Sequence, residues 1–116
     1  MRHKKKGKTL DRKAAPRKAL LRNLATSLVV YDKINTTTAK AKALKPIVER
    51  IITTAKTNDL NVRRKLALTL THQKAIKKAV EVLGPRYIDR KGGYLRITKI
   101  GPRPGDGAEI SAIEFV

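Results

Sequence analysis

The chain contains no cysteine and no tryptophan, and only one phenylalanine and three tyrosines among its 116 residues. The absence of cysteine excludes disulfide bonds, thiol catalysis and cysteine-ligated zinc. The scarcity of aromatic residues predicts an aliphatic core. No stretch approaches the roughly 20 consecutive apolar residues that a membrane-spanning helix requires, and charged residues interrupt any apolar signal-peptide core. The composition therefore predicts a small domain without cysteine chemistry and with no membrane partner.

Acidic residues are also scarce, because nine Asp and Glu stand against 28 Lys and Arg, for a formal net charge of +19. The acids are scattered, and the nearest pair, Asp106 and Glu109, flanks a glycine-rich turn. This spacing favours turn chemistry over acid–base catalysis, so a nuclease or nucleotide transferase lacks the clustered carboxylates it would need. His3 and His72 have no carboxylate at metal-ligand spacing. We expect no enzyme, no metal, no cofactor and no small-molecule substrate.

The positive charge is concentrated at the N-terminus, where the first 22 residues carry ten Lys or Arg and a single acid, Asp11. Residues 1–10 have no large apolar side chain before Leu10 except Met1, so they cannot bury themselves and should form an extended arm. Nucleic acid phosphate is the commonest polyanion that such a segment binds. We therefore expect a basic arm, residues 1–10, and a single nucleic-acid-binding domain, residues 11–116.

Apolar residues recur at helical spacing in about four segments, beginning near residues 16, 38, 59 and 72. Thr38 and Asp59 are suitable N-caps for the second and third helices. Pro46 should kink or restart the second helix, because proline removes one hydrogen bond and clashes with the preceding turn. Gly84 and Pro85 should end the fourth helix.

Three further segments predict strands, at residues 34–37, 94–100 and 108–116. The turn at residues 101–107 should join the last two strands in an antiparallel hairpin. A third strand and helical cover would make this sheet stable, whereas a lone hairpin is marginal. The sequence therefore predicts an α/β fold of the α+β type, with about four helices on a small mixed sheet of about three strands.

Aromatic residues on which bases could stack are almost absent. With Tyr31, Tyr87 and Phe115 expected in the core, only Tyr94 is left for stacking. Binding should therefore be mainly to phosphates and shape. A sequence-tolerant DNA architectural protein is one alternative, and it should prefer duplex DNA over structured RNA. A membrane-active cationic protein is another, and it should bind anionic vesicles.

Two local features allow both a functional and a structural interpretation. Gly92 and Gly93 could let the backbone approach a phosphate, or could form a plain turn into a strand. The basic runs at residues 63–65 and 77–78 could contact nucleic acid or could be solvated helix faces.

Several short motifs occur in order along the whole chain: Met1-Arg-His-Lys4, Gly7-Lys8-x-Leu10-x-Arg12, residues 17–22, Asn35-Thr-Thr-Thr-Ala-Lys-Ala-Lys-Ala-Leu44, residues 52–56, Arg63-Arg64, Gly84-Pro-Arg-Tyr87, Arg90-x-Gly-Gly-Tyr-x-Arg96 and Gly105-Asp-Gly-Ala108. Each motif alone is weak, but their joint order resembles the family of protein seventeen of the bacterial large ribosomal subunit. The resemblance extends from Met1 to Val116 without a large insertion.

The resemblance implies a structural constituent of the large ribosomal subunit that binds and stabilises large-subunit ribosomal RNA and supports translation. It implies a place near the peptide exit side, neighbouring ribosomal proteins as partners, and no catalysis. The location would be the cytoplasm, in the ribosome, or an organelle of bacterial descent. From the charge pattern and the resemblance together, the expected RNA contacts are Arg2, His3, Lys4, Lys5, Lys6, Lys8, Arg12, Lys13, Arg17, Lys18, Arg22, Arg63, Arg64, Arg86, Arg90, Lys91 and Arg96.

Overall fold

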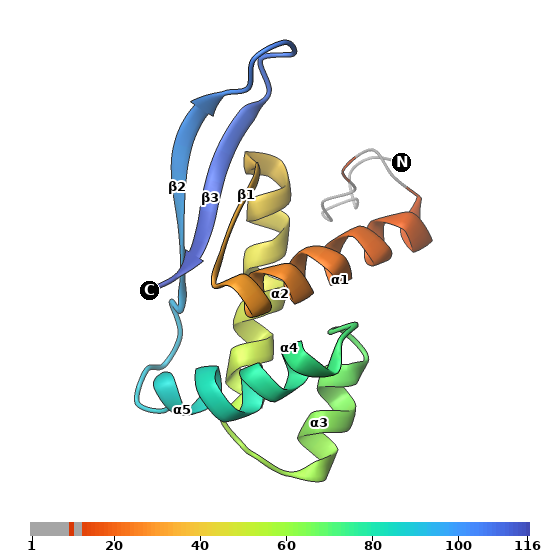
Figure 1. The fold of residues 1–116 in the computed structure, drawn as a ribbon, viewed down its shortest axis with the longest axis vertical. Helices are drawn as coiled ribbons and strands as arrows, with labels where there is room; N and C mark the ends of the chain where they lie inside the picture. Colours follow the sequence, from red (N-terminus) through yellow and green to blue (C-terminus); the bar gives the residue numbers. More distant parts are fainter. Residues whose placement is uncertain (1–9, 11–12) are drawn as a thin grey trace, which may run out of the picture.

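The computed structural model describes residue 10 and residues 13–116, and it has the expected α+β class, with helices packed on a three-stranded sheet (Figure 1). Residues 1–9 and 11–12, which include most of the predicted arm, lie outside the described residues. The elements in chain order are α1 (Ala14–Tyr31), β1 (Lys33–Thr37), α2 (Thr38–Ala55), α3 (Leu60–Ala67), α4 (Gln73–Lys78), the π-helical segment η2 (Ala79–Leu83), α5 (Gly84–Arg86), β2 (Leu95–Pro102) and β3 (Glu109–Phe115).

The sheet has the strand order β1-β3-β2 and is antiparallel throughout rather than mixed. β3 lies between β1 and β2 and separates the two strands that run in the same direction. Ile113 of β3 is opposite Ile34 on one side and Ile97 on the other. Ile113 is fully buried, and α2 packs against all three strands. The outer part of the β2–β3 hairpin extends beyond the helices (Figure 1).

The N-cap of helix α2 is Thr37, one residue before the expected cap, Thr38. The hydroxyl of Thr37 accepts a hydrogen bond from the Lys40 N–H at 3.4 Å and caps the helix. Thr38 points inward instead, and its hydroxyl lies 2.6 Å from the hydroxyl of Ser111 in the core. The helix does not restart at Pro46, which is exposed on its surface. The Asp59 cap of α3 is confirmed by a 2.8 Å hydrogen bond from the Val62 N–H to its carboxylate.

Gly84 does not end the fourth helical segment, because α4, η2 and α5 follow one another without a break as far as Arg86. Gly84 has helical backbone angles, with φ −54° and ψ −56°. A Cβ atom on Gly84 would lie only 2.4 Å from the carbonyl oxygen of Ala55 in α2. The glycine is therefore required for the close approach of two helices, and its chain-breaking tendency is overridden by packing.

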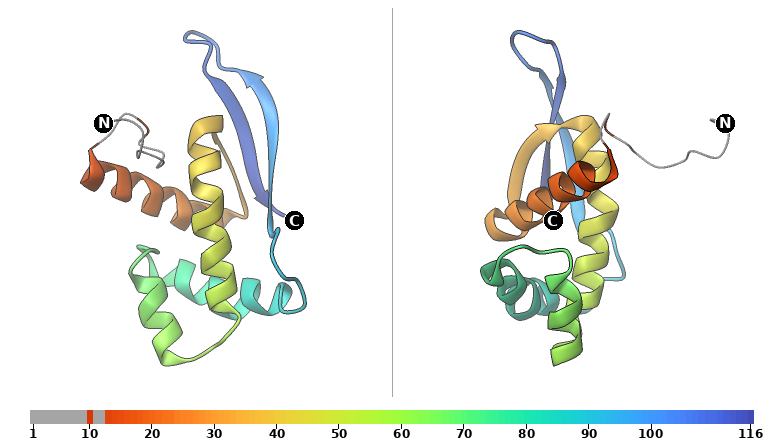
Figure 2. Two further views of the ribbon diagram at one scale, coloured as in Figure 1. Left: turned by 180° about the vertical axis from the view of Figure 1, so that it is seen from behind. Right: turned by 90° about the vertical axis from the view of Figure 1, so that its right-hand side faces the viewer.

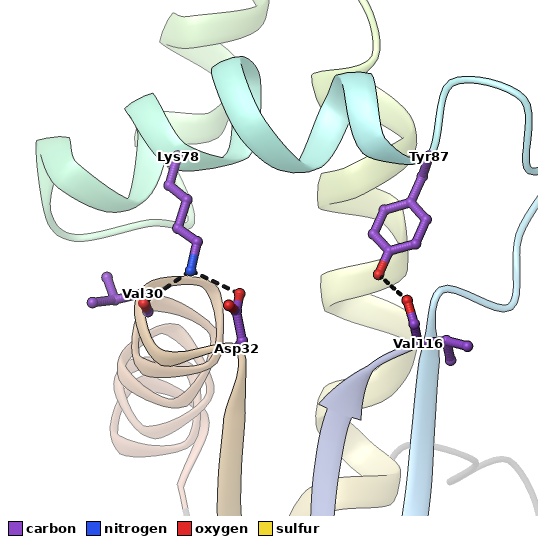
Figure 3. Close-up of polar contacts among 5 residues, drawn as sticks. All are labelled: Val30, Asp32, Lys78, Tyr87 and Val116. Carbon is purple, nitrogen blue, oxygen red and sulfur yellow. Dashed lines mark hydrogen bonds and ion pairs between the residues drawn. The ribbon is translucent and has the colours of Figure 1, made fainter.

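Two polar side chains, Lys78 and Tyr87, join this helical segment to the rest of the fold (Figure 3). The ammonium group of Lys78 donates to the carbonyl of Val30 at 3.0 Å and to the carboxylate of Asp32 at 2.7 Å, where α1 ends. The hydroxyl of Tyr87 donates to the main-chain oxygen of Val116 at 2.7 Å. Cations at the carboxyl end of a helix also complement its dipole. Both contacts hold segments that are distant in sequence.

Candidate nucleic-acid interface

An open groove of about 890 Å³ lies between three helices, and we call it the α1–α2–α3 groove. Figure 2 shows α1 and α3 projecting to the same side of α2, and residues of all three helices line the groove. The loop that precedes β2 borders the groove as well. The lining residues are Lys18, Leu21, Arg22, Ile47, Glu49, Arg50, Ile51, Thr53, Thr54, Lys65, Leu66, Leu68, Thr69, Gly92 and Tyr94.

Four cations surround this groove: Lys18 and Arg22 on α1, Arg50 on α2 and Lys65 on α3. All four are exposed. Within the described part of the chain, none has a carboxylate at ion-pair distance. Glu49 is the one acid among the described lining residues, and its carboxylate accepts a 3.2 Å hydrogen bond from the Tyr94 N–H. The groove therefore carries an excess of positive charge, which would attract an anionic ligand.

The structure brings two of the predicted RNA contacts, Lys18 and Arg22, into this groove one helical turn apart. Lys13 is exposed at the start of α1, and Arg17 is partly buried on the same helix. The predicted contacts that precede Lys13 lie outside the described residues; they are Arg2, His3, Lys4, Lys5, Lys6, Lys8 and Arg12.

Two cations of the groove, Arg50 and Lys65, are not among the predicted RNA contacts, although Lys65 belongs to the basic run at residues 63–65 whose role the sequence left open. Each directly precedes a buried residue of its helix, Ile51 (4% exposed) and Leu66 (3% exposed). A cation beside the apolar stripe of a helix lies at the border of the core, which is where a groove between helices opens. A search of the helical wheels for such bordering cations would have found both residues.

The two predicted cations of α3, Arg63 and Arg64, face different surroundings. The guanidinium of Arg63 lies 3.5 Å from the carboxylate of Glu81 in η2 and 3.5 Å from the Asn58 side-chain oxygen. Arg64 is exposed. Consecutive helical residues point about 100° apart, so a basic pair in sequence does not make a pair in space. Arg64 is therefore better placed than Arg63 to meet an external anion.

Three further predicted contacts lie between η2 and β2: Arg86 is the last residue of α5, and Arg90 and Lys91 lie in the loop that follows it. All three are exposed. The Arg86 guanidinium lies 5.9 Å from the centre of the Tyr87 ring. The Nε of Arg90 donates to the carbonyl of Gly92 at 3.2 Å. The ammonium group of Lys56 donates to the main-chain carbonyl of Arg90. These contacts fix the loop while leaving its charges accessible.

Gly92 and Gly93 have positive φ angles of 129° and 62°, which side chains rarely tolerate. A Cβ atom at either position would meet nothing within 4 Å. The backbone conformation of a turn into β2 is therefore sufficient to explain both glycines. The close approach of a phosphate to the backbone of Gly92 and Gly93 stays a prediction.

Tyr94 is not available for base stacking, contrary to expectation. It is only 2% exposed, and its ring centre lies 5.2 Å from that of Tyr87. The Lys56 ammonium group, followed by the hydroxyl of Thr53, lowers the pKa of the Tyr94 hydroxyl. Tyr31, expected in the core, is 72% exposed, because it is the last residue of α1 and lies beyond the packed part of that helix.

Within residues 13–116, no three His, Asp or Glu side chains gather into a group that could hold a metal ion. None of the described helices has the length and hydropathy of a membrane span.

Comparison with known proteins identifies the family. The family model for ribosomal protein L17 matches residues 20–116. The chain belongs to the ribosomal protein L17 family. It is 52% identical to large ribosomal subunit protein bL17 of Solibacter usitatus (strain Ellin6076), over all of this chain and 77% of that protein. The bL17 proteins of Thermomicrobium roseum and Rickettsia bellii are 47% and 51% identical over the whole of this chain, which covers 99% and 82% of them.

Membership of the L17 family confirms the resemblance found in the sequence motifs. L17-family proteins are structural constituents of the large ribosomal subunit rather than enzymes, and binding to ribosomal RNA is general among them. The alignments to bL17 relatives cover residues 1–19, which precede the family-model match.

In this L17-family chain one predicted contact, Arg96, lies on the sheet, where it is opposite Glu114. Its guanidinium donates to the Glu114 carboxylate from Nη2 at 2.8 Å and from Nε at 3.3 Å. These bonds lower the pKa of Glu114. Arg96 is therefore separate from the groove, and its charge is compensated within the protein.

Proposed function

We propose that this L17-family chain acts in the large ribosomal subunit by binding large-subunit ribosomal RNA at the α1–α2–α3 groove and neutralising its phosphates. The observation that carries the proposal is the set of four exposed cations, Lys18, Arg22, Arg50 and Lys65, around one groove. The three helices are packed on a common core, so they hold these charges at a fixed spacing. Crowded phosphates repel one another, and a rigid array of cations favours the RNA fold that brings them together.

The exposed cations of the loop before β2 would extend the groove, since Gly92 of this loop also lines it. We propose Arg90 and Lys91 of this loop as further contacts, together with Lys13, Arg17, Arg64 and Arg86 on or beside the helices. Arg63 and Arg96 would contribute less, because a phosphate would have to displace a carboxylate partner from each.

We further propose that residues 1–10 form an arm that reaches RNA and that residues 11–116 are one domain. Deleting residues 1–8 should leave that domain folded but weaken RNA association. Neighbouring ribosomal proteins would be its other partners, and the site of action would be the ribosome in the cytoplasm. The family membership and the charge of the arm support this assignment. Co-sedimentation of the native protein with large subunits after a high-salt wash tests it, and loss of the protein in that wash would contradict it.

The salt dependence of RNA binding tests the groove itself. If the protein neutralises about six phosphates, the logarithm of its affinity should fall with the logarithm of salt concentration with a slope of about −4 to −5. Arg22→Gln and Arg50→Gln should each make that slope shallower by about 0.7 to 0.9. The affinity of each variant for large-subunit ribosomal RNA would be measured at several salt concentrations.

A matched control is available at the tip of the β2–β3 hairpin. Arg103 is exposed like the groove cations, but it forms an ion pair with Asp106 and does not line the groove. Arg103→Gln should therefore leave the slope unchanged. Equal slopes for all three variants and the original protein would refute the assignment of the groove to RNA. A preference for duplex DNA over structured RNA at equal salt would refute RNA as the partner.

A further inference from the structure

The α1–α2–α3 groove combines two kinds of surface. Its floor is the apolar part of the lining, with Leu21, Ile47 and Leu68, and its rim is formed by the four cations Lys18, Arg22, Arg50 and Lys65. We propose that the floor receives an unpaired nucleobase of RNA, while the rim cations hold the phosphates on either side of it. The inference rests on the proposed function and names the RNA feature that is recognised, which is a bulged or looped-out nucleotide rather than a continuous duplex.

The floor contains aliphatic side chains that the fold leaves uncovered. Leu68 is 73% exposed, although the neighbours of its own turn, Leu66 and Leu70, are buried. Leu21 of α1 and Ile47 of α2 are half-buried in the same groove. A group of exposed aliphatic side chains within one groove indicates an interaction site rather than an ordinary solvated surface.

Hydrogen bonds of the neighbouring backbone fix the position of Leu68. The N–H of Leu70 donates to the carbonyl of Leu66 at 2.8 Å, which closes the turn after α3. The N–H of Thr71 then donates to the hydroxyl of Thr26 in α1 at 3.0 Å. Leu68 is thereby held at the edge of the groove by contacts on both sides of it.

The rim sets the charge of the occupant. Lys18, Arg22, Arg50 and Lys65 favour an anion, and the carboxylate of Glu49 is engaged with the backbone at the start of β2. An occupant must therefore offer an apolar face and negative charges together. An unpaired nucleotide does so, whereas a duplex presents only its phosphates and keeps its bases stacked inside. Leucine and isoleucine are also the side chains that proteins insert against unstacked bases.

The size and the polar groups of the groove suit a nucleotide. Its volume of about 890 Å³ is within the range of about 300–1,000 Å³ that is typical of sites for small molecules. Thr54 and Thr69 line it and carry hydroxyls that can donate to or accept from the edge of a base. An acidic amphipathic peptide could also combine an apolar face with charge, but the surrounding cations are those already proposed to bind RNA.

The test compares two RNA stems of the same sequence, one fully paired and one with a single bulged 2-aminopurine nucleotide. The protein should bind the bulged stem about tenfold more tightly, because the face of the unpaired base and the aliphatic side chains would be removed from water together. The fluorescence of 2-aminopurine should change on binding. Equal affinity for the two stems would overturn the inference.

Leu68→Ser should remove the preference for the bulged stem while leaving the salt slope and the affinity for the paired stem unchanged. Leu60→Ser is the matched control, since Leu60 is 62% exposed at the other end of α3 and does not line the groove. Both variants should keep the thermal midpoint of the original protein, because both side chains are exposed. A preference retained in Leu68→Ser would overturn the inference.

The proposed function and this inference can fail separately. If Arg22→Gln makes the salt slope shallower for both stems but no preference for the bulge exists, the groove binds phosphates and the inference is wrong. If an acidic amphipathic peptide binds the groove and the bulged stem is not preferred, the inference is again wrong. If neither stem binds in a salt-dependent way, the proposed function fails first.

Discussion

Replacing Gly84 by alanine tests how closely α5 approaches α2. The new Cβ atom would lie 2.4 Å from the carbonyl oxygen of Ala55 and 3.3 Å from that of Ala79. The first distance is about 1 Å below the 3.4 Å at which ordinary contact begins. Both oxygens belong to the backbone of helices, so no flexible side chain can move aside. Relief requires that α5 and α2 separate.

Two opposing effects decide the sign of the change in stability. Alanine is favoured over glycine inside a helix by about 0.8–1 kcal/mol, and Gly84 has helical angles. Overpacking a well-packed interior typically costs about 1–3 kcal/mol, and overlap with rigid backbone belongs at the upper end. We therefore expect the free energy of unfolding of Gly84→Ala to fall by about 1–2 kcal/mol. Each kilocalorie should lower the melting temperature by about 4–8 °C.

Urea unfolding followed by far-ultraviolet circular dichroism would measure this change. Lys77 provides the control, because it is exposed on α4 in the same helical segment. The difference between Lys77→Ala and Lys77→Gly reports the helix propensity alone and should favour alanine. If Gly84→Ala is as stable as the original protein, or more stable, the close approach of the two helices is not what requires glycine and the reasoning is refuted.

Three further predictions concern single polar contacts. Tyr87→Phe removes the hydrogen bond to Val116 and should lower the free energy of unfolding by about 1 kcal/mol, measured by urea titration; no change would mean that water replaces the bond. Asp59→Ala removes the cap of α3 and should cost about 1 kcal/mol, whereas Asp59→Asn should restore most of it in the same assay. The Arg103 guanidinium lowers the pKa of Asp106 to about 2. The stabilising contribution of Asp106 is therefore complete above its unfolded-state pKa of about 3.9 and is lost as the pH falls towards 2. Titration of the Asp106 carboxyl by NMR should give a midpoint near pH 2. Arg103→Gln should raise that midpoint, and an unchanged midpoint would contradict the role of Arg103.

Much of the fold could be predicted because local patterns determine it. The strands at residues 34–37 and 108–116 and the Asp59 cap follow from residue types alone. The failures arise where packing overrides a local rule. Gly84 would end a helix by its own preference, but the backbone of Ala55 requires a residue without a side chain there.

The two misassigned tyrosines show a related limit. Periodicity finds the face of a helix that points towards the core, but it does not show where along the helix the core ends. Tyr31 therefore continues an apolar stripe and is nonetheless exposed, while Tyr94, which follows two glycines, is covered by α2 and Tyr87.

The candidate interface was predicted only in part, because charge in a sequence does not show which charges are already paired. Arg63 and Arg96 have carboxylate partners that only the tertiary structure brings near, Glu81 and Glu114. Lys65 is not among the predicted contacts, although it directly follows Arg63 and Arg64, which are. The geometry of the groove, and not the density of basic residues, distinguishes the cations that face outward together.

The strand that completes the sheet is the last of the three to leave the site of synthesis. β1 and β2 are not neighbours in the sheet, and among the strands of the described residues each pairs with β3 alone. A nascent chain that stops before Glu109 therefore has no two strands that can pair, however long β1 has been available. The face of α2 that packs on the sheet stays uncovered until β3 has been made, so the sheet forms in one late step rather than strand by strand.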